Sequence, residues 1–224
     1  MTYTNGNFEA HLAALCLLGT LGLTVLLAIL TGVLFFTRRA WARYSLLASV
    51  LLLAGYAAVV ALFSATSFDR IVGRGDEKFY CGLDCHIAYS VGNVERTKTI
   101  GDTRASGEFY VIVVRSHFDK RTIGPRRGDR PLRPDPPTLT LIDGSGHSYP
   151  VSSPGQQAWK TTHGQSHSLG EPLRPGEWFE TTWVFDVPAG AKNVRMFAGW
   201  SGLPSYLMIG DEASPRHKKT YFAL

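Results

Sequence analysis

The chain has 224 residues, and its 23 Lys and Arg against 18 Asp and Glu give a formal net charge of +5. Apolar residues gather in the first third, whereas charge and proline gather in the rest. This length suits one membrane hairpin and one compact domain and excludes a third unit of ordinary size. Much of the positive charge lies in residues 115–133, which argues against a general nucleic-acid role.

Two uncharged apolar runs, at residues 12–36 and 46–63, are long enough to cross a membrane, for which about 20 apolar residues suffice. We therefore expect residues 1–65 to form a two-helix transmembrane anchor in a lipid bilayer. The absence of Asp, Glu, Lys, Arg and His from both runs favours a plain anchor over an ion path. Small residues such as Gly19, Gly22 and Gly32 permit close contact within the hairpin or with another membrane subunit.

The short link between the two runs sets the predicted orientation. It carries Arg38, Arg39 and Arg43, with Trp41 and Tyr44 as interfacial aromatics. No Lys or Arg precedes the first run, so the positive-inside bias places the link in the cytoplasm. The N-terminus and the C-terminal domain are then expected on the periplasmic side of a bacterial inner membrane.

Beyond residue 65 the pattern changes to short β-rich runs separated by Gly, Pro and Asp, which is typical of strands and turns. We expect a linker at residues 66–86 and an all-β domain at residues 87–224. The predicted fold is an immunoglobulin-like antiparallel sandwich of seven or eight strands. The expected strands cover residues 87–99, 109–118, 138–142, 147–151, 178–187, 193–197, 206–209 and 220–224.

Two phrases carry a resemblance to a known group of proteins. LRPGEWFETTWVFDVP at residues 173–188 and MIGDEASPRHKKTYF at residues 208–222 resemble the late strands of bacterial membrane-anchored immunoglobulin-like domains of unknown function. The similarity covers the chain from about Phe109 onward, and the Pro-Gly-Glu and Phe-Asp-Val-Pro turns are its most specific part. It implies a sandwich with an interaction role and no chemistry.

The layout of two helices followed by an external sandwich is also similar to cytochrome oxidase subunit II. The dinuclear copper motif of that family is Cys-x3-Cys-x3-His-x2-Met, late in the sandwich. Here Cys81-x3-Cys85 lies directly after the second apolar run, Tyr89 occupies the His position and Gly92 the Met position. These departures argue against that copper centre.

The segment with Cys81, Cys85 and His86 is the strongest candidate for chemistry, and three interpretations compete. In an oxidising compartment the two cysteines pair as a disulfide. Alternatively, two thiolates and an imidazole bind copper or zinc, with Met208, His217 or Asp84 completing the site. A third interpretation is a variant haem c attachment, because Cys-x3-Cys-His is one residue longer than the usual motif. We expect the disulfide and no cofactor.

A long proline-rich connection at residues 119–137 is the candidate interaction site. Proline limits the entropy lost when such a loop docks, so the loop suits an acidic partner surface or anionic lipid headgroups. The alternative is a solvated surface loop without a partner. Its basic residues are Lys120, Arg121, Arg126, Arg127, Arg130 and Arg133.

No catalytic residues are predicted. His163 and His167 have a spacing that binds metal on a helix, but Gly164 and the neighbouring serines predict a loop there. The sequence contains no nucleophile elbow, phosphate-binding glycine loop or His-Glu-x-x-His motif.

Three functions follow from these patterns. The leading hypothesis is a non-catalytic accessory subunit that caps the periplasmic face of a larger membrane complex, with a respiratory or photosynthetic electron-transfer complex as one candidate host. The first alternative is a periplasmic redox protein that binds metal or haem through Cys81, Cys85 and His86. The second is a free-standing membrane-anchored binding module.

Overall fold

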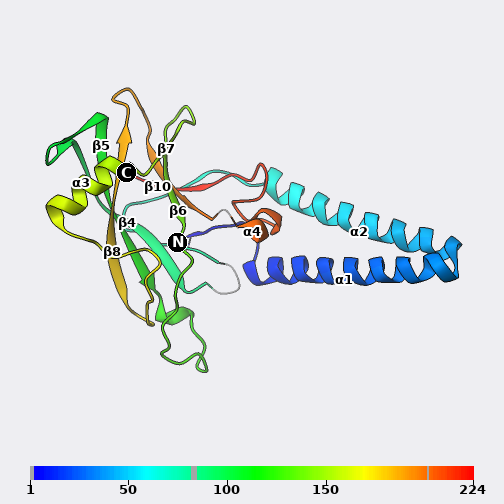
Figure 1. The fold of residues 1–224 in the computed structure, drawn as a ribbon. Helices are drawn as coiled ribbons and strands as arrows, with labels where there is room; N and C mark the ends of the chain where they lie inside the picture. Colours follow the sequence, from blue (N-terminus) through cyan, green and yellow to red (C-terminus); the bar gives the residue numbers. More distant parts are fainter. Residues whose placement is uncertain (1–2, 82–84, 201) are drawn as a thin grey trace.

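The computed structural model describes residues 3–81, 85–200 and 202–224. Two long helices lie side by side and project from one end of a β-rich domain, and the first and last parts of the chain meet where the two bodies join (Figure 1). We call the pair of helices the hairpin and the β-rich body the sandwich.

The hairpin consists of α1 (Ala10–Thr37) and α2 (Arg39–Ala65). Both helices are long and apolar enough to cross a membrane, and they include the two predicted spans. The link between them is shorter than expected, because Arg38 alone separates the helices. This turn lies at the end of the molecule remote from the sandwich (Figure 1).

Two five-stranded sheets form the sandwich in the part of the chain that the structure describes. The first has the order β1-β3-β4-β5-β8, and the second has the order β2-β10-β9-β6-β7. The first sheet contains β1 (Tyr3–Thr4), β3 (Lys78–Phe79), β4 (Ile87–Ile100), β5 (Thr103–Phe118) and β8 (Trp178–Val187). The second contains β2 (Arg70–Val72), β6 (Thr138–Ile142), β7 (Ser148–Pro150), β9 (Arg195–Gly199) and β10 (Thr220–Ala223).

The chain forms the expected sandwich, but its sheets are not antiparallel throughout, as the predicted immunoglobulin-like fold requires. β1 pairs with β3 in parallel, and β2 pairs with β10 in parallel, so both sheets are mixed. Of the strands in these parallel pairs, β1 lies in the N-terminal segment and β2 and β3 lie in the predicted linker, and all three are too short to show a period of two residues. The long strands β4 and β8, by contrast, begin and end close to their predicted bounds, whereas β5 ends at the predicted Phe118 but begins at Thr103 rather than Phe109.

Two helices replace predicted loop and strand. Residues 206–209 were expected as a strand, but the chain there forms α4 (Leu203–Leu207), with Pro204 in its first turn. Proline fits the first turn of a helix and cannot donate to a sheet. The second helix, α3 (Ser153–His163), is capped by Ser152 at its start and by Gly164, whose φ is +84°, after its last residue.

α3 covers the exposed edge of the first sheet. The side chain of Gln156 donates to the Thr182 carbonyl at 2.9 Å and accepts from the Val184 backbone N–H at 3.0 Å. One amide thus satisfies two backbone groups of the edge strand β8, which would otherwise be free to pair with another chain. His163 ends this helix, whereas His167 lies in the loop beyond it.

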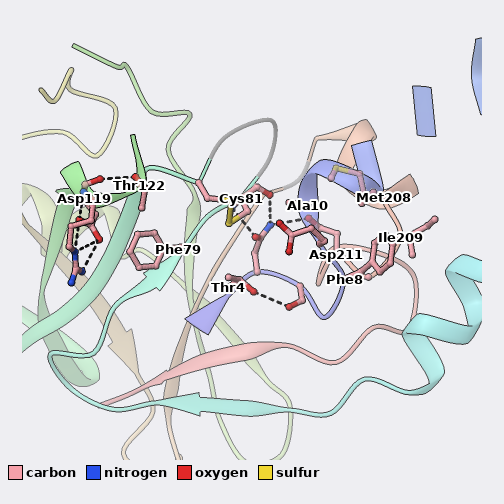
Figure 2. Close-up of a pocket in the computed structure, with 17 residues that line it drawn as sticks. Thr4, Phe8, Ala10, Phe79, Cys81, Asp119, Thr122, Met208, Ile209 and Asp211 are labelled. Atoms are coloured by element: carbon pink, nitrogen blue, oxygen red, sulfur yellow. Dashed lines mark hydrogen bonds and ion pairs between the residues drawn. A yellow bond between two sulfur atoms is a disulfide. The ribbon is translucent and has the colours of Figure 1, made fainter. Parts of the chain in front are cut away.

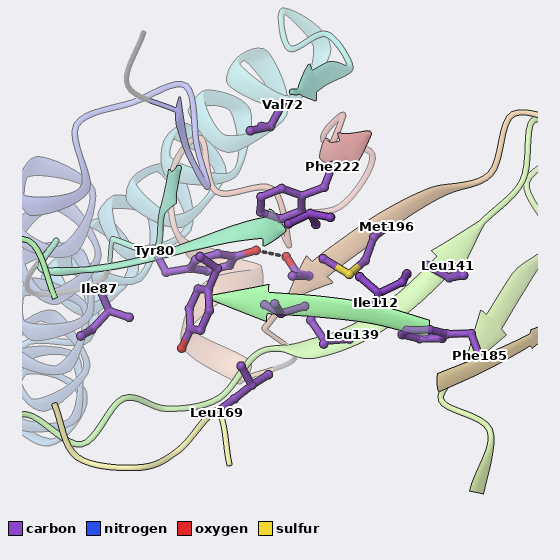
Figure 3. Packing of buried hydrophobic residues seen from close by; sticks show 14 of the residues in the cluster. Val72, Tyr80, Ile87, Ile112, Leu139, Leu141, Leu169, Phe185, Met196 and Phe222 are labelled. Carbon is purple, nitrogen blue, oxygen red and sulfur yellow. Dashed lines mark hydrogen bonds between the residues drawn. The ribbon is translucent and has the colours of Figure 1, made fainter. Parts of the chain in front are cut away.

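The core between the sheets is apolar and continuous, and Figure 3 shows part of it. Ile112 and Phe185 of the first sheet and Leu141, Met196 and Phe222 of the second are all buried there.

One charged side chain also crosses this core. Lys78 on β3 is fully buried, and its Nζ lies 2.7 Å from Oε1 of Glu212 and 3.0 Å from the Thr220 carbonyl oxygen. The ring of Tyr80 lies 4.8 Å from the same Nζ. Burial lowers the pKa of Lys78, and the Glu212 carboxylate opposes this effect. The ion pair therefore ties the first sheet to the segment before β10.

Breaking this pair on one side should destabilise the sandwich. In Lys78→Ala, Glu212 stays buried without its partner, so we expect the free energy of unfolding to fall by about 3–5 kcal/mol. The double variant Lys78→Met, Glu212→Gln should recover most of the loss, because it leaves no buried charge unpaired. Chemical unfolding in detergent, followed by circular dichroism, measures both. Equal losses in the two variants would contradict a role for the unpaired charge.

Candidate functional site

The hairpin and the sandwich are joined by two segments that lie about 200 residues apart in the sequence. Residues 5–8, just before α1, pair with residues 208–212: Gly6 bridges Asp211, the Asn7 N–H donates to the Gly210 carbonyl at 2.9 Å, and the Glu212 N–H donates to the Asn5 carbonyl at 2.8 Å. We call these paired segments the joint.

Glycine is required on both sides of the joint. A Cβ on Gly6 would lie 2.5 Å from the carbonyl oxygen of Gly210, and a Cβ on Gly210 would lie 2.6 Å from the Cβ of Phe8. Gly210 also has a φ of +72°, which favours glycine. The two backbones therefore approach too closely for other residue types.

Side chains fix the ends of both helices to the joint. Asn7 Nδ2 donates to the Phe63 carbonyl near the end of α2 at 3.1 Å, and the Tyr56 hydroxyl donates to the Leu207 carbonyl at 2.7 Å. Met208 and Ile209 pack in an apolar cluster with the first turns of α1 and the last turns of α2. The sandwich is consequently held in one orientation on the hairpin.

Cys81 and Cys85 form the expected disulfide. The side chain of Asn5 contacts both backbone groups of Cys81, because Oδ1 accepts from its N–H at 2.9 Å and Nδ2 donates to its carbonyl at 3.2 Å. The disulfide therefore lies directly against the joint, a relationship that the sequence did not predict.

A cavity of about 480 Å³ lies between the joint, the disulfide and the turn that begins the basic loop (Figure 2). Its apolar wall includes Phe8, Phe79, Met208 and Ile209, and its polar wall includes Asn5, Asp119, Arg121 and Asp211. Ala10 and Ala13 on α1 complete the lining at the hairpin side. The cavity is thus amphipathic, and it opens beside the start of the first apolar helix.

Asp211 is the buried acid of this cavity. Its Oδ2 accepts from Asn5 Nδ2 at 3.0 Å, and its Oδ1 accepts from the Ala213 N–H at 2.8 Å. Burial raises the pKa of Asp211 to about 7, although the hydrogen bond from Ala213 opposes the shift. Neighbouring Glu212 adds to the increase. A carboxyl group at the joint thus titrates near neutral pH.

The residues of the proposed metal site are only partly brought together. Cys81, Cys85 and Met208 line the same cavity, but the two sulfurs are bonded to each other. His86 contacts Thr122 at 2.8 Å, and His217 contacts Asn7 at 3.1 Å, and neither lines the cavity. Asp84 lies outside the described residues. Within those residues, no group of three or more His, Cys, Asp and Glu side chains is placed to hold a metal ion.

The basic loop begins at the cavity and runs away from it. Arg121 pairs with the buried carboxylate of Asp119 at 2.8 Å, and this pairing lowers the pKa of Asp119. Arg127 donates to the Arg130 carbonyl at 2.7 Å. The remaining cations, Lys120, Arg126, Arg130 and Arg133, are exposed. Only Arg121 is therefore neutralised within the loop by an ion pair in the part of the chain described.

The arginines of the predicted cytoplasmic link lie together at the far end of the hairpin. Arg38 forms the turn, and Arg39 and Arg43 are exposed on the first turns of α2. The guanidinium of Arg39 lies 5.3 Å from the ring centre of Phe35.

Fold and site together define a β-sandwich that carries an apolar two-helix hairpin, with a disulfide and a cavity at its joint. No family model and no curated protein matches the chain, so neither resemblance seen in the sequence has family support. Two solved structures show a low similarity to parts of the chain. A secreted protein from Mycobacterium tuberculosis, MPT63, is 11% identical, with a TM-score of 0.41 over 71% of this chain and 100% of that one. A conserved hypothetical protein from Bacillus anthracis is 14% identical, with a TM-score of 0.35 over 50% of this chain and 80% of that one.

Titration of Asp211 should make stability fall as the pH rises. Its pKa is about 7 in the folded chain and 3.8 as a free side chain, so its contribution is complete below pH 3.8 and is lost as the pH rises through about 7. Between about pH 5 and 7, the wild type should therefore lose stability relative to Asp211→Asn, by at most about 3 kcal/mol. Thermal unfolding at several pH values measures this difference.

Asp143 supplies a matched control. Burial raises its pKa, but hydrogen bonds from the His147 backbone and the Tyr149 hydroxyl lower it to about 2, so the group stays charged across this range. Asp143→Asn should show no change in its stability difference from wild type between about pH 5 and 7. The same pH slope in both comparisons would rule out Asp211 as the titrating group.

Proposed function

We propose that this chain is a non-catalytic accessory subunit of a larger bacterial inner-membrane complex. The hairpin spans the membrane and packs on the helices of another subunit. The sandwich lies in the periplasm and caps the outer surface of the complex.

Open glycines on the hairpin are the observation that carries this proposal. A methyl group added at Gly19, Gly22, Gly32 or Gly55 would meet no heavy atom within 4 Å outside its own helix turn, in the residues that the structure describes. Glycine within a helix costs about 1 kcal/mol relative to alanine. Because packing of α1 on α2 does not need these glycines, we infer that they admit the close approach of a partner helix.

The joint supports a capping role. A sandwich held by Asn7, Tyr56 and the Met208 cluster keeps a fixed height and rotation above the hairpin. A partner that binds the hairpin would therefore meet the same face of the sandwich each time, without the entropy cost of ordering a flexible link.

Charge supports the orientation. Arg38, Arg39 and Arg43 lie at the hairpin turn, remote from the sandwich (Figure 1). The positive-inside bias then places the turn in the cytoplasm and the sandwich outside. An oxidising periplasm also suits the Cys81–Cys85 disulfide.

The basic loop gives the cap a surface for an acidic partner. Both ends of the loop are tied down, by Asp119 at the start and by the bridge between Leu132 and Leu173 near its end. Its exposed cations are thereby held in place rather than spread over a mobile tail, which favours electrostatic docking.

Filling the open glycine face should release the chain from its complex. In mild detergent, the wild type should purify from native membranes together with larger membrane subunits. In Gly19→Leu, Gly22→Leu, the added side chains prevent close helix contact, so most of the chain should migrate alone on native gels.

Ala28→Leu is the matched control, because Ala28 is an exposed position on α1 that already carries a Cβ. This variant should remain in the complex. Wild-type protein that migrates as a lone species, at every mild detergent concentration tested, would contradict an accessory subunit.

The cavity favours a second candidate function, a membrane-anchored binding module. An apolar wall that is continuous with α1, with Asp211 and Arg121 at the polar side, suits an amphiphile that enters from the outer leaflet. Its apolar part would contact Phe8, Phe79 and Met208.

A bulky side chain in the cavity tests this candidate. Ala10→Phe should reduce the amount of lipid that remains bound to the purified protein, because the ring would occupy the apolar part of the cavity. Native mass spectrometry of protein in mild detergent measures bound lipid. Ala40→Phe places the same side chain at the exposed hairpin turn and should leave the amount unchanged. Equal lipid retention in both variants would show that the lipid does not bind in the cavity.

A further inference from the structure

We propose that α4 is a foot of the sandwich that inserts into the outer leaflet of the bilayer and contacts lipid directly. This inference rests on the membrane-spanning hairpin of the proposed function, and it adds a second, non-spanning contact between the chain and the membrane. The helix is short and carries Leu203, Tyr206 and Leu207, which are 73%, 42% and 44% exposed.

The depth of α4 is set by its contact with α2. The hydroxyl of Tyr56 donates to the Leu207 carbonyl at 2.7 Å. At about 1.5 Å per residue, Tyr56 lies about 13 Å before α2 ends at Ala65, well within the apolar run. A tyrosine side chain is too short to span that distance, so the end of α4 lies below the outer end of α2. Figure 1 shows α4 between the ends of the two hairpin helices.

The residues after α4 confirm this level independently. Met208 and Ile209 belong to an apolar cluster that includes Ala13, Ala14 and Leu17 on α1. Leu17 lies about two turns into α1, which begins at Ala10. Both helices thus place the segment beside the apolar spans rather than above them.

Carbonyl groups at the end of α4 have hydrogen-bond partners within the protein, which surroundings without water require. Carbonyl groups at the end of a helix lack internal partners, and leaving them unpaired in hydrocarbon is costly. Tyr56 donates to the Leu207 carbonyl, and Ser214 Oγ donates to the Met208 carbonyl at 2.6 Å. Side chains thus satisfy carbonyls that water would satisfy on an ordinary surface loop.

The exposed side chains of α4 suit contact with lipid of the outer leaflet, which is the one partner that we propose for this helix. Leu203 and Leu207 are exposed apolar side chains in a segment, Gly202 to Gly210, that carries no charged residue, and Tyr206 has the amphipathic ring that favours the headgroup boundary. Just beyond the end of α2, Phe68 is 64% exposed and lies under the guanidinium of Arg70, 4.7 Å away. This pair is suited to the adjoining headgroup layer.

Spin labelling in lipid nanodiscs tests the proposal on the full chain. Leu203→Cys and Leu207→Cys are each made in a Cys16→Ala background, so that the paired cysteines stay unlabelled in the absence of reductant. Collision rates of each label are measured with oxygen, which concentrates in lipid, and with a water-soluble nickel complex. We expect both labels to collide with oxygen severalfold more, relative to nickel, than a label in water does.

Two further labels make each failure distinguishable. Leu51→Cys, on the middle of α2, reports a lipid-facing position of the span, and Gln157→Cys, on α3 at the far side of the sandwich, reports water. If Leu51→Cys behaves like Gln157→Cys, the hairpin does not span the bilayer and the proposed function fails. If Leu51→Cys reports lipid but the α4 labels report water, the foot is overturned. Shielding of the α4 labels from both reagents would also overturn it, because protein rather than lipid then covers α4.

Discussion

The arrangement of the molecule depends on the pairing of residues 5–7, which lie just before α1 in the sequence, with residues 210–212. This contact holds the start of the hairpin against the C-terminal segment of the sandwich. Asn5 also accepts from the Cys81 backbone N–H and so connects the contact to the disulfide. Because Gly6 and Gly210 leave no room for a Cβ, the contact is rigid as well as close. The cavity, the orientation of the sandwich and the level of α4 all follow from it.

Buried charge lies next to this contact. Lys78, Glu212 and Asp211 are all nearly inaccessible to water, and a buried ion pair contributes little net stability once desolvation is included. We infer that the pair favours one register, because Glu212 contacts Lys78 and also accepts from the Thr220 N–H. The neighbouring Asp211 completes the network through Asn5. A shifted pairing of the joint would leave these groups without partners.

Local sequence patterns predicted the parts of the fold whose cause is local. An uncharged run of 25 residues, or a long run rich in aromatic and β-branched residues such as β8, specifies its own structure. The joint, β1, β2 and β3 are specified by partners far away in the chain, and no short window contains that information. α4 shows the same limit, since Tyr206 and Ile209 favour a strand, while Pro204 and the contact with Tyr56 decide for a helix. The Cys81–Cys85 pairing was predictable from spacing, but its contact with Asn5 was not.

The sheet pairing constrains topology without reference to charge. β1, which precedes the first helix, pairs with β3, which follows the second, and Asn5 contacts Cys81. Both ends of the hairpin must therefore lie on one side of any membrane, so an odd number of crossings is incompatible with the folded sandwich. The positive-inside bias of the three arginines is then needed only to decide on which side of the membrane the turn lies. Because β3 follows the second helix in the chain, the first sheet cannot be completed until both hairpin helices have been made.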